Sequence, residues 1–171
     1  GMDETLSVQA DMYSLPQNDN SPIEIAESII DSMPNCPHME HIQQRAFYNQ
    51  LLDMVNVPPI ETFDNSEEYY CTVFHELVHS TKHESRLNRG NKTCEPDFYN
   101  SHAYTKEELV AEMGAAFLCG FAGIVNNTIN NSASYIDSWL KVINKDDRIL
   151  VIAAAHAQKA ADYILDRKEV S

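Results

Sequence analysis

Residues 75–79 read His75-Glu76-Leu77-Val78-His79, and this short stretch decides how the rest of the chain is interpreted. It matches the HExxH pattern, in which two histidines four residues apart lie on one face of a helix. Both imidazoles can coordinate one Zn²⁺, and the glutamate beside them can accept a proton from metal-bound water. The pattern therefore predicts His75 and His79 as zinc ligands and Glu76 as a catalytic base.

The flanking residues predict a helix of about 66–83 around this motif. Residues 64–66 are Asp, Asn and Ser, which are favourable N-caps, and the two glutamates that follow suit the positive end of a helix. Apolar side chains mark one side of the helix as core: Tyr70, Val73, Phe74, Leu77 and Val78. The alternative interpretation is that both histidines are partly buried helix residues that bind no metal.

A catalytic zinc site needs a third protein ligand and one position left open for water. His83 lies about 12 Å along a continuous helix from His75, which is too far to share one metal. The metzincin pattern is disfavoured, because residues 80–83 contain no glycine. The remaining source is the acidic stretch of residues 107–112, which would complete a site of the His2Glu type found in thermolysin.

Within this stretch we assign Glu108 as the third ligand and Glu112 as its partner. On a helix both face the same side, so Glu112 can accept the free N–H of a ligating imidazole and fix its tautomer. Ligation by Glu112 or Glu107 instead stays open. A further alternative is a capping box, in which Glu108 would only bond the backbone N–H of Thr105. Small residues such as Ala111 and Ala115 favour close approach of the two helices, and hence the ligand role.

The other segments predict a mostly helical α+β fold. Residues 1–21 are polar and are expected to form a flexible tail or linker, so that the domain comprises residues 22–171. We expect one or two strands with an exposed edge over 46–57, a loop over 88–103 and a helix from Thr105 to about Cys119. Further helices are predicted over 22–33, 132–142 and 146–166.

Length and charge restrict the function. The chain of 171 residues suits one domain, and its formal net charge is -14. Residues 1–80 hold fourteen acidic residues and one basic residue, Arg45, so direct nucleic-acid binding is not expected. The basic cluster Lys82, Arg86, Arg89 and Lys92 is interpreted as an ordinary solvated stretch. Without a CxxC pair, a membrane span or a secretory signal, we expect free thiols and a cytoplasmic protein.

Two sequence blocks carry a resemblance to a known family. The first runs from Tyr69 to Leu87 and contains HExxH, and the second runs from Tyr104 to Phe117. Together they resemble the zincin-like metallopeptidase domain of ArdC-type antirestriction and TraC-type plasmid primase proteins. In that family the domain usually follows a single-stranded-DNA-binding domain, which we expect this chain to be too short to contain. The family commonly has an aromatic residue after the second histidine, where this chain has Ser80.

The resemblance implies a gluzincin-type fold with a small sheet beside the HExxH helix, and it supports Glu108 as a ligand. The leading hypothesis is a zinc peptidase acting on a peptide or protein, with Tyr104, His102 or Arg86 as the oxyanion donor and Tyr104 as our choice. The alternative is a non-enzymatic, metal-stabilised accessory module of an antirestriction or plasmid DNA-processing protein, with DNA contacted through a separate N-terminal domain. No membrane partner is expected, and the oligomeric state stays open.

Overall fold

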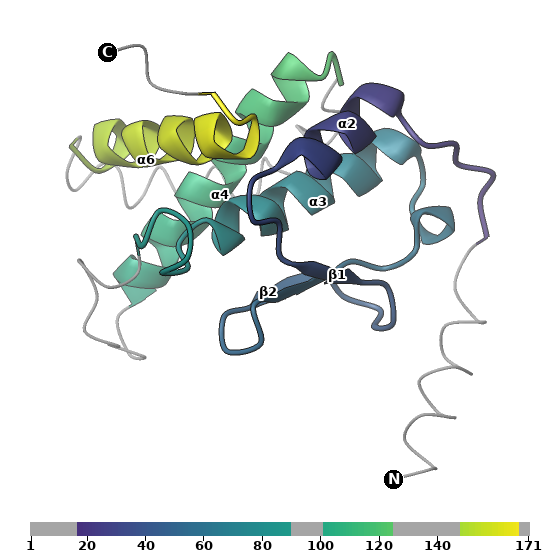
Figure 1. Cartoon of the computed structure of the whole chain (residues 1–171), viewed down its shortest axis with the longest axis horizontal. Helices are drawn as coiled ribbons and strands as arrows, with labels where there is room; N and C mark the ends of the chain where they lie inside the picture. Colours follow the sequence, from purple (N-terminus) through teal and green to yellow (C-terminus); the bar gives the residue numbers. More distant parts are fainter. Residues whose placement is uncertain (1–16, 90–100, 125–147, 168–171) are drawn as a thin grey trace, which may run out of the picture.

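The computed structural model describes residues 17–89, 101–124 and 148–167, apart from the side chains of residues 101–105 (Figure 1). Its four helices and small three-stranded sheet confirm the predicted α+β class. The elements are α2 (Glu24–Ser32), β1 (His38–Glu40), β2 (Phe47–Asn49), β3 (Met54–Asn56), the 3₁₀ turn η1 (Ile60–Thr62), α3 (Ser66–Ser80), α4 (Ser101–Phe121) and α6 (Arg148–Ile164). The helix predicted over 132–142 lies outside the described residues.

Helix α3 carries the HExxH motif and begins as predicted. The Asn65 side chain accepts a hydrogen bond from the Glu68 backbone N–H at 2.9 Å, which makes Asn65 the N-cap among the three candidates that the sequence offers. The helix ends at Ser80, three residues before the predicted end. The hydroxyls of Ser80 and Thr81 donate to the carbonyls of Leu77 and Val78, both at 2.6 Å, and the Thr81 backbone N–H donates to the same two carbonyls, so the last turn is closed by side chains as well as backbone.

Helix α4 begins at Ser101, so the start predicted at Thr105 is wrong by one turn. An N-cap residue has a non-helical backbone and stands at the helix start, whereas Thr105 lies inside the helix. The capping-box alternative for Glu108 is therefore wrong as well. The helix ends near the two predicted glycines. Gly123 has a φ of +68°, and the next residue, Ile124, donates its N–H to the Cys119 carbonyl at 2.9 Å.

The sheet has the order β1-β3-β2, with β1 parallel and β2 antiparallel to the central strand. Of the one or two strands predicted over 46–57 the structure has two, β2 and β3, whereas β1 was not predicted. Three residues are too few to produce a recognisable alternation of polar and apolar side chains. Asn56 on β3 is fully buried and its side chain forms hydrogen bonds with four backbone groups of residues 42–45. It therefore holds the segment between β1 and β2 against β3.

Helix α3 lies at the centre, in contact with the sheet and with α4 and α6, as Figure 1 shows. Its buried side chains form one core with residues of α2, α4 and α6. The predicted close approach of α4 to α3 is confirmed. A Cβ atom on Gly114 would stand 2.8 Å from Cγ2 of Val78, so the two helices touch where a side chain would not fit. The alanine-rich α6 packs on α4, with Ala157, Ala160 and Ala161 buried.

The described N-terminal residues lie against the domain. Asn18 and Asn20 donate to the Phe63 carbonyl, each at 2.7 Å, and Asn20 also donates to the Ile60 carbonyl. Residues 17–21, assigned to the predicted tail, are thus attached to η1. The boundary at residue 22 stays a prediction, because residues 1–16 lie outside the described part. Helix α2 starts at Glu24, two residues after the predicted start at Pro22.

In the described residues no helix has the length and apolar character that crossing a bilayer would need.

Candidate metal centre

Helix α3 presents its two histidines on one face. The ring centroids of His75 and His79 are 4.8 Å apart, and their Nε2 atoms are 3.1 Å apart. His79 is buried at 8% exposure, and His75 is partly buried. The two Nε2 atoms therefore point to a common position, as the spacing predicts.

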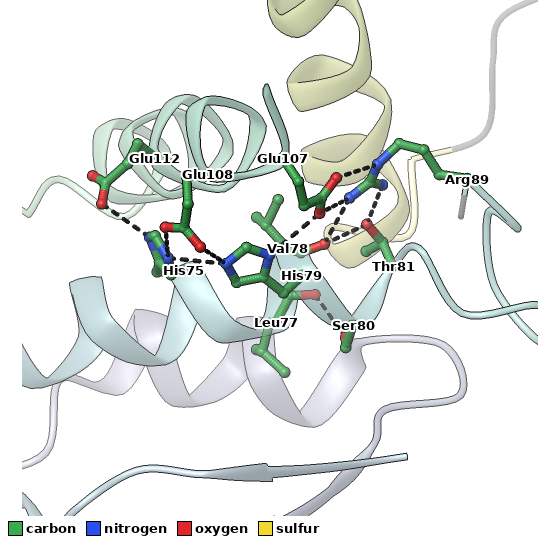
Figure 2. Close-up of polar contacts among 10 residues, drawn as sticks. All are labelled: His75, Leu77, Val78, His79, Ser80, Thr81, Arg89, Glu107, Glu108 and Glu112. Atoms are coloured by element: carbon green, nitrogen blue, oxygen red, sulfur yellow. Dashed lines mark hydrogen bonds and ion pairs between the residues drawn. The ribbon is translucent and has the colours of Figure 1, made fainter. Parts of the chain in front are cut away.

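Helix α4 adds a carboxylate at this position. Glu108 places Oε2 at 3.2 Å from His75 Nε2 and Oε1 at 2.9 Å from His79 Nε2. One ligand atom from each of the three residues can be chosen so that all lie within 4.8 Å of one another. Figure 2 shows the carboxylate reaching from α4 across both imidazoles. The structure thus brings together the three residues predicted to hold zinc.

The far sides of both imidazoles also face carboxylates. Glu112 Oε1 lies 3.2 Å from His75 Nδ1, in the arrangement predicted for it. Glu107 Oε1 lies 3.2 Å from His79 Nδ1, a role that the sequence did not reveal. A carboxylate at Nδ1 holds the proton there, which leaves the Nε2 lone pair free to bind a metal. Each histidine therefore has a carboxylate that selects its metal-binding tautomer.

This arrangement fits a small cation. Three ligand atoms at about 2.1 Å from zinc in tetrahedral geometry would stand about 3.4 Å from one another. In the structure the two Nε2 atoms are 3.1 Å apart, and each lies near a different Glu108 oxygen, at 3.2 Å for His75 and 2.9 Å for His79. In the tautomer fixed by Glu107 and Glu112, two lone pairs and a carboxylate converge. Such a set repels itself unless a positive charge lies between its members.

The pKa values of the two histidines indicate how the site balances its negative charge when no metal is bound. Burial opposes a charged His75, but the carboxylates of Glu108 and Glu112 outweigh it and raise the His75 pKa to about 10. Burial likewise opposes a charged His79, and Glu107 with Glu108 raises the His79 pKa. Burial acts to raise the Glu108 pKa, but the two imidazoles lower it. Protons on the imidazoles therefore supply positive charge to the metal-free site.

Glu76 is buried on the same helix, at 8% exposure. Burial raises its pKa above the ordinary glutamate value, while His75 and His79 act in the opposite direction. A carboxylate with a raised pKa beside a metal site accepts a proton more readily than a solvated one. Glu76 thus has the environment that its predicted role as a base requires.

Arg89 supports Glu107 from the side opposite His79, as Figure 2 shows. Its Nη2 lies 2.8 Å from Glu107 Oε1, and its Nη1 donates to Thr81 Oγ1 at 2.8 Å. The Nη2 group also donates to the Val78 carbonyl at 3.3 Å. The Arg89 side chain is only 8% exposed, so its interpretation as part of a solvated basic stretch is wrong. Spacing could not reveal this role, since Arg89 lies in the loop after α3 and Glu107 on α4.

Arg86 is excluded as an oxyanion donor. Its side chain is fully buried and pairs with both carboxylate oxygens of Asp53, at 2.7 and 3.0 Å. It also donates to the carbonyls of Asn35 and Ser80, so its N–H groups are directed away from the imidazoles. Tyr104 and His102 lie within α4, but only their backbone is described, and their side chains are not. His83 bonds Ser85 rather than the site, in agreement with its predicted exclusion as a ligand.

Comparison with known protein families finds a match. The model of the zincin-like metallopeptidase family matches residues 24–156. Among curated proteins, a DNA primase TraC of Escherichia coli is 37% identical over 146 residues, which cover 85% of this chain and 13% of the primase. An uncharacterised protein y4eC of Sinorhizobium fredii is 29% identical over 160 residues, which cover 91% of this chain and 50% of that protein.

Among solved structures, the antirestriction protein ArdC of plasmid R388 has the same fold. Its Mn(II)-bound crystal structure matches with a TM-score of 0.69 and 31% identity, over 92% of this chain and 56% of ArdC. Its metal-free crystal structure matches with a TM-score of 0.67 and 32% identity, over 90% of this chain and 53% of ArdC. The chain thus spans about half of ArdC and about an eighth of the primase.

Proposed function

This chain belongs to the zincin-like metallopeptidase family, and we propose that it is a zinc-dependent peptidase of the gluzincin type. One observation carries the proposal: His75, His79 and Glu108 converge within 4.8 Å, with the buried carboxylate of Glu76 on the same helix as the two histidines. Three protein ligands leave a fourth position for water or substrate, which is the arrangement of a catalytic rather than a structural zinc site.

In this proposal the metal is held by the Nε2 atoms of His75 and His79 and by the Glu108 carboxylate, and Glu112 fixes the tautomer of His75. When bound, zinc supplies a Lewis acid for the scissile carbonyl and lowers the pKa of its water. A set of two imidazoles and one carboxylate also accepts other divalent metals. ArdC was crystallised with Mn(II), so manganese belongs in any metal test.

The protein residues then move the proton. Glu76 accepts a proton from the attacking water and passes it to the nitrogen of the leaving amine, for which its raised pKa is favourable. A hydrogen-bond donor is needed where negative charge develops on the substrate oxygen. With Arg86 bonded to Asp53, Tyr104 is our proposed donor.

A second candidate function follows from the relatives, whose names concern DNA and restriction rather than proteolysis. In this candidate the chain is a metal-stabilised accessory module of a plasmid DNA-processing or antirestriction protein, and a separate domain contacts the DNA. Glu76 separates the two candidates, because a structural metal site has no use for a buried base beside it. In either case we propose a cytoplasmic protein, and for the peptidase a peptide or protein substrate.

The deciding experiment is Glu76→Gln, assayed with a fluorogenic peptide library in the presence of zinc or manganese. We expect the variant to keep its metal and to lose hydrolysis, because the amide cannot accept the proton. Equal cleavage by the variant and the unchanged protein would contradict the mechanism. Cleavage by neither, with metal bound to both, would favour the accessory module.

The ligand set is tested by elemental analysis of chelator-free protein. We expect one zinc per chain and none in a His75→Ala, His79→Ala double variant. Glu108→Ala should weaken zinc binding by more than the roughly 10- to 100-fold expected when an outer partner such as Glu112 is removed. A larger effect of Glu112→Ala than of Glu108→Ala would make Glu112 the ligand.

A further inference from the structure

Cys71 and Cys119 meet across the contact between α3 and α4. Their Sγ atoms are 2.8 Å apart, within 1 Å of the roughly 2.05 Å of a disulfide bond. Both are free thiols in the structure. Cys119 is buried at 1% exposure, whereas Cys71 is partly exposed. One residue of the pair is therefore partly open to solvent, while the other is buried and places its sulfur against it.

This pair belongs to the same row of contacts as the metal centre. Cys71 lies one turn before His75 on α3, and Cys119 lies two turns after Glu112 on α4, so each cysteine shares a helix face with the metal-site residue. The contacts then run from Cys71 with Cys119 to His75 with Glu112 and on to His79 with Glu107, along two antiparallel helices. A bond between the sulfurs would tie together the helices that supply the metal ligands.

We propose that Cys71 and Cys119 are a redox modification site, at which a low-molecular-weight disulfide such as oxidised glutathione produces a reversible disulfide between α3 and α4. This part of the proposal is independent of the peptidase function. Its consequence for the metal rests on the proposed metal centre: the disulfide fixes the spacing between the histidines and Glu108 and so increases metal affinity. Fixing a binding geometry in advance removes part of the entropy cost of binding.

The chemistry balances in two exchange steps. The Cys71 thiolate attacks one sulfur of oxidised glutathione, the glutathione disulfide breaks, and one glutathione leaves as its thiol after taking up a proton. The Cys119 thiolate then attacks the Cys71 sulfur of the mixed disulfide and displaces the second glutathione. Two protein thiols are oxidised by two electrons in total, and one oxidised glutathione is reduced to two thiols that carry the two protons away.

The order of attack follows from exposure and hydrogen bonding. The hydrogen bond between the two thiols lowers the Cys71 pKa, although burial and the nearby carboxylates of Glu112 and Glu68 act in the opposite direction. The same contact and burial raise the Cys119 pKa. Cys71 is thus the thiol that meets the oxidant, and Cys119 is the thiol that resolves the mixed disulfide.

The test is intact-mass measurement and peptide mapping of the full chain after treatment with oxidised glutathione. We expect a product lighter by two hydrogens, with Cys71 joined to Cys119. Cys119→Ser and Cys119→Ala should each stop with one glutathione attached to Cys71, whereas the control Cys36→Ser should form the disulfide. Free Cys71 and Cys119 after oxidation, or a disulfide that joins either of them to Cys36 or Cys94, would overturn the proposal.

The consequence is tested by zinc titration of the oxidised and reduced forms. We expect the oxidised form to have a dissociation constant about fivefold lower, at the low end of coupling between two sites, and dithiothreitol to reverse the change. Equal affinities would overturn the coupling and leave the modification site standing. Absence of zinc binding in both forms would count against the metal centre alone, because the disulfide is detected by mass without metal or substrate.

Discussion

Arg86 and Arg89 lie three residues apart and form the same kind of ion pair, but they support different regions of the molecule. Both lie in the loop after α3, both side chains are almost fully buried, and both bond a carboxylate. The carboxylate of Asp53 also accepts a hydrogen bond from the Tyr48 hydroxyl, which joins the loop to the β2–β3 turn. The carboxylate of Glu107 instead faces His79. The second partner of the carboxylate therefore decides whether the arginine secures the fold or the metal centre.

The two regions should respond to pH in opposite directions, and we expect this to be the largest effect. In the metal-free protein the His75 pKa is raised from its ordinary 6.5 to about 10, so its contribution to stability is complete below pH 6.5 and is lost as pH rises through about 10. Arg86 lowers the Asp53 pKa, so that contribution is present above the ordinary value of 3.8 and is lost on acidification.

Denaturation of chelator-treated, metal-free protein between pH 6.5 and 10 measures the loss of the His75 contribution to stability, with His75→Asn as the matched control. We expect the midpoint of denaturation to fall as the pH rises in the unchanged protein, and to fall less in the variant. Acid denaturation of Asp53→Asn measures the second part. An identical alkaline loss in His75→Asn would mean that other groups cause it.

Asp53→Asn should destabilise the fold by about 3 kcal/mol, because it leaves the buried Arg86 charge without its counter-charge. Asparagine suits the backbone there, where φ is 47°. The zinc affinity of the folded variant should stay unchanged. Urea denaturation and zinc titration measure the two quantities, and Asp166→Asn, at an exposed aspartate with a φ of 54°, is the control. A loss of zinc affinity would remove the distinction between the regions.

Arg89→Met should weaken zinc binding by about 10- to 100-fold, the usual effect of removing support from a ligating histidine. Glu107 would keep its place on α4 but lose the guanidinium that holds it toward His79. Competitive titration with a chromophoric chelator measures the change, and Arg45→Met, at an exposed arginine near the sheet, is the control. Unchanged affinity would show that Arg89, like Arg86, serves only the fold.

Thr81→Val should produce the smallest effect, about fivefold in zinc affinity, which corresponds to about 1 kcal/mol for one hydrogen bond. The hydroxyl of Thr81 accepts from Arg89 Nη1, so valine would remove one of the contacts that orient the guanidinium. The same titration measures it, and Thr72→Val, whose hydroxyl bonds only the Glu68 carbonyl among the contacts of the described residues, is the control. An effect larger than that of Arg89→Met would assign the leading role to Thr81.

The sequence by itself determined the features that depend on the spacing of residues within one helix. The HExxH helix follows from its Asn65 cap and apolar stripe, and the four-residue spacing of His75 and His79 places both imidazoles on one face. The assignment of Glu108 and Glu112 followed from the chemistry of a His2Glu site and from the helical face that they share. The structure places both beside the imidazoles, and their roles at the metal stay predictions.

The tertiary structure alone decided what depends on contacts between distant segments. Residue 89 meets residue 107, and residue 86 meets residue 53, only because the chain folds back, and no periodicity encodes either meeting. The strand β1 and the early start of α4 at Ser101 were missed for a similar reason, since very short strands and helix ends depend on their neighbours more than on propensity. Local rules therefore predicted the candidate metal ligands, whereas packing decided which other charged residues lie against them.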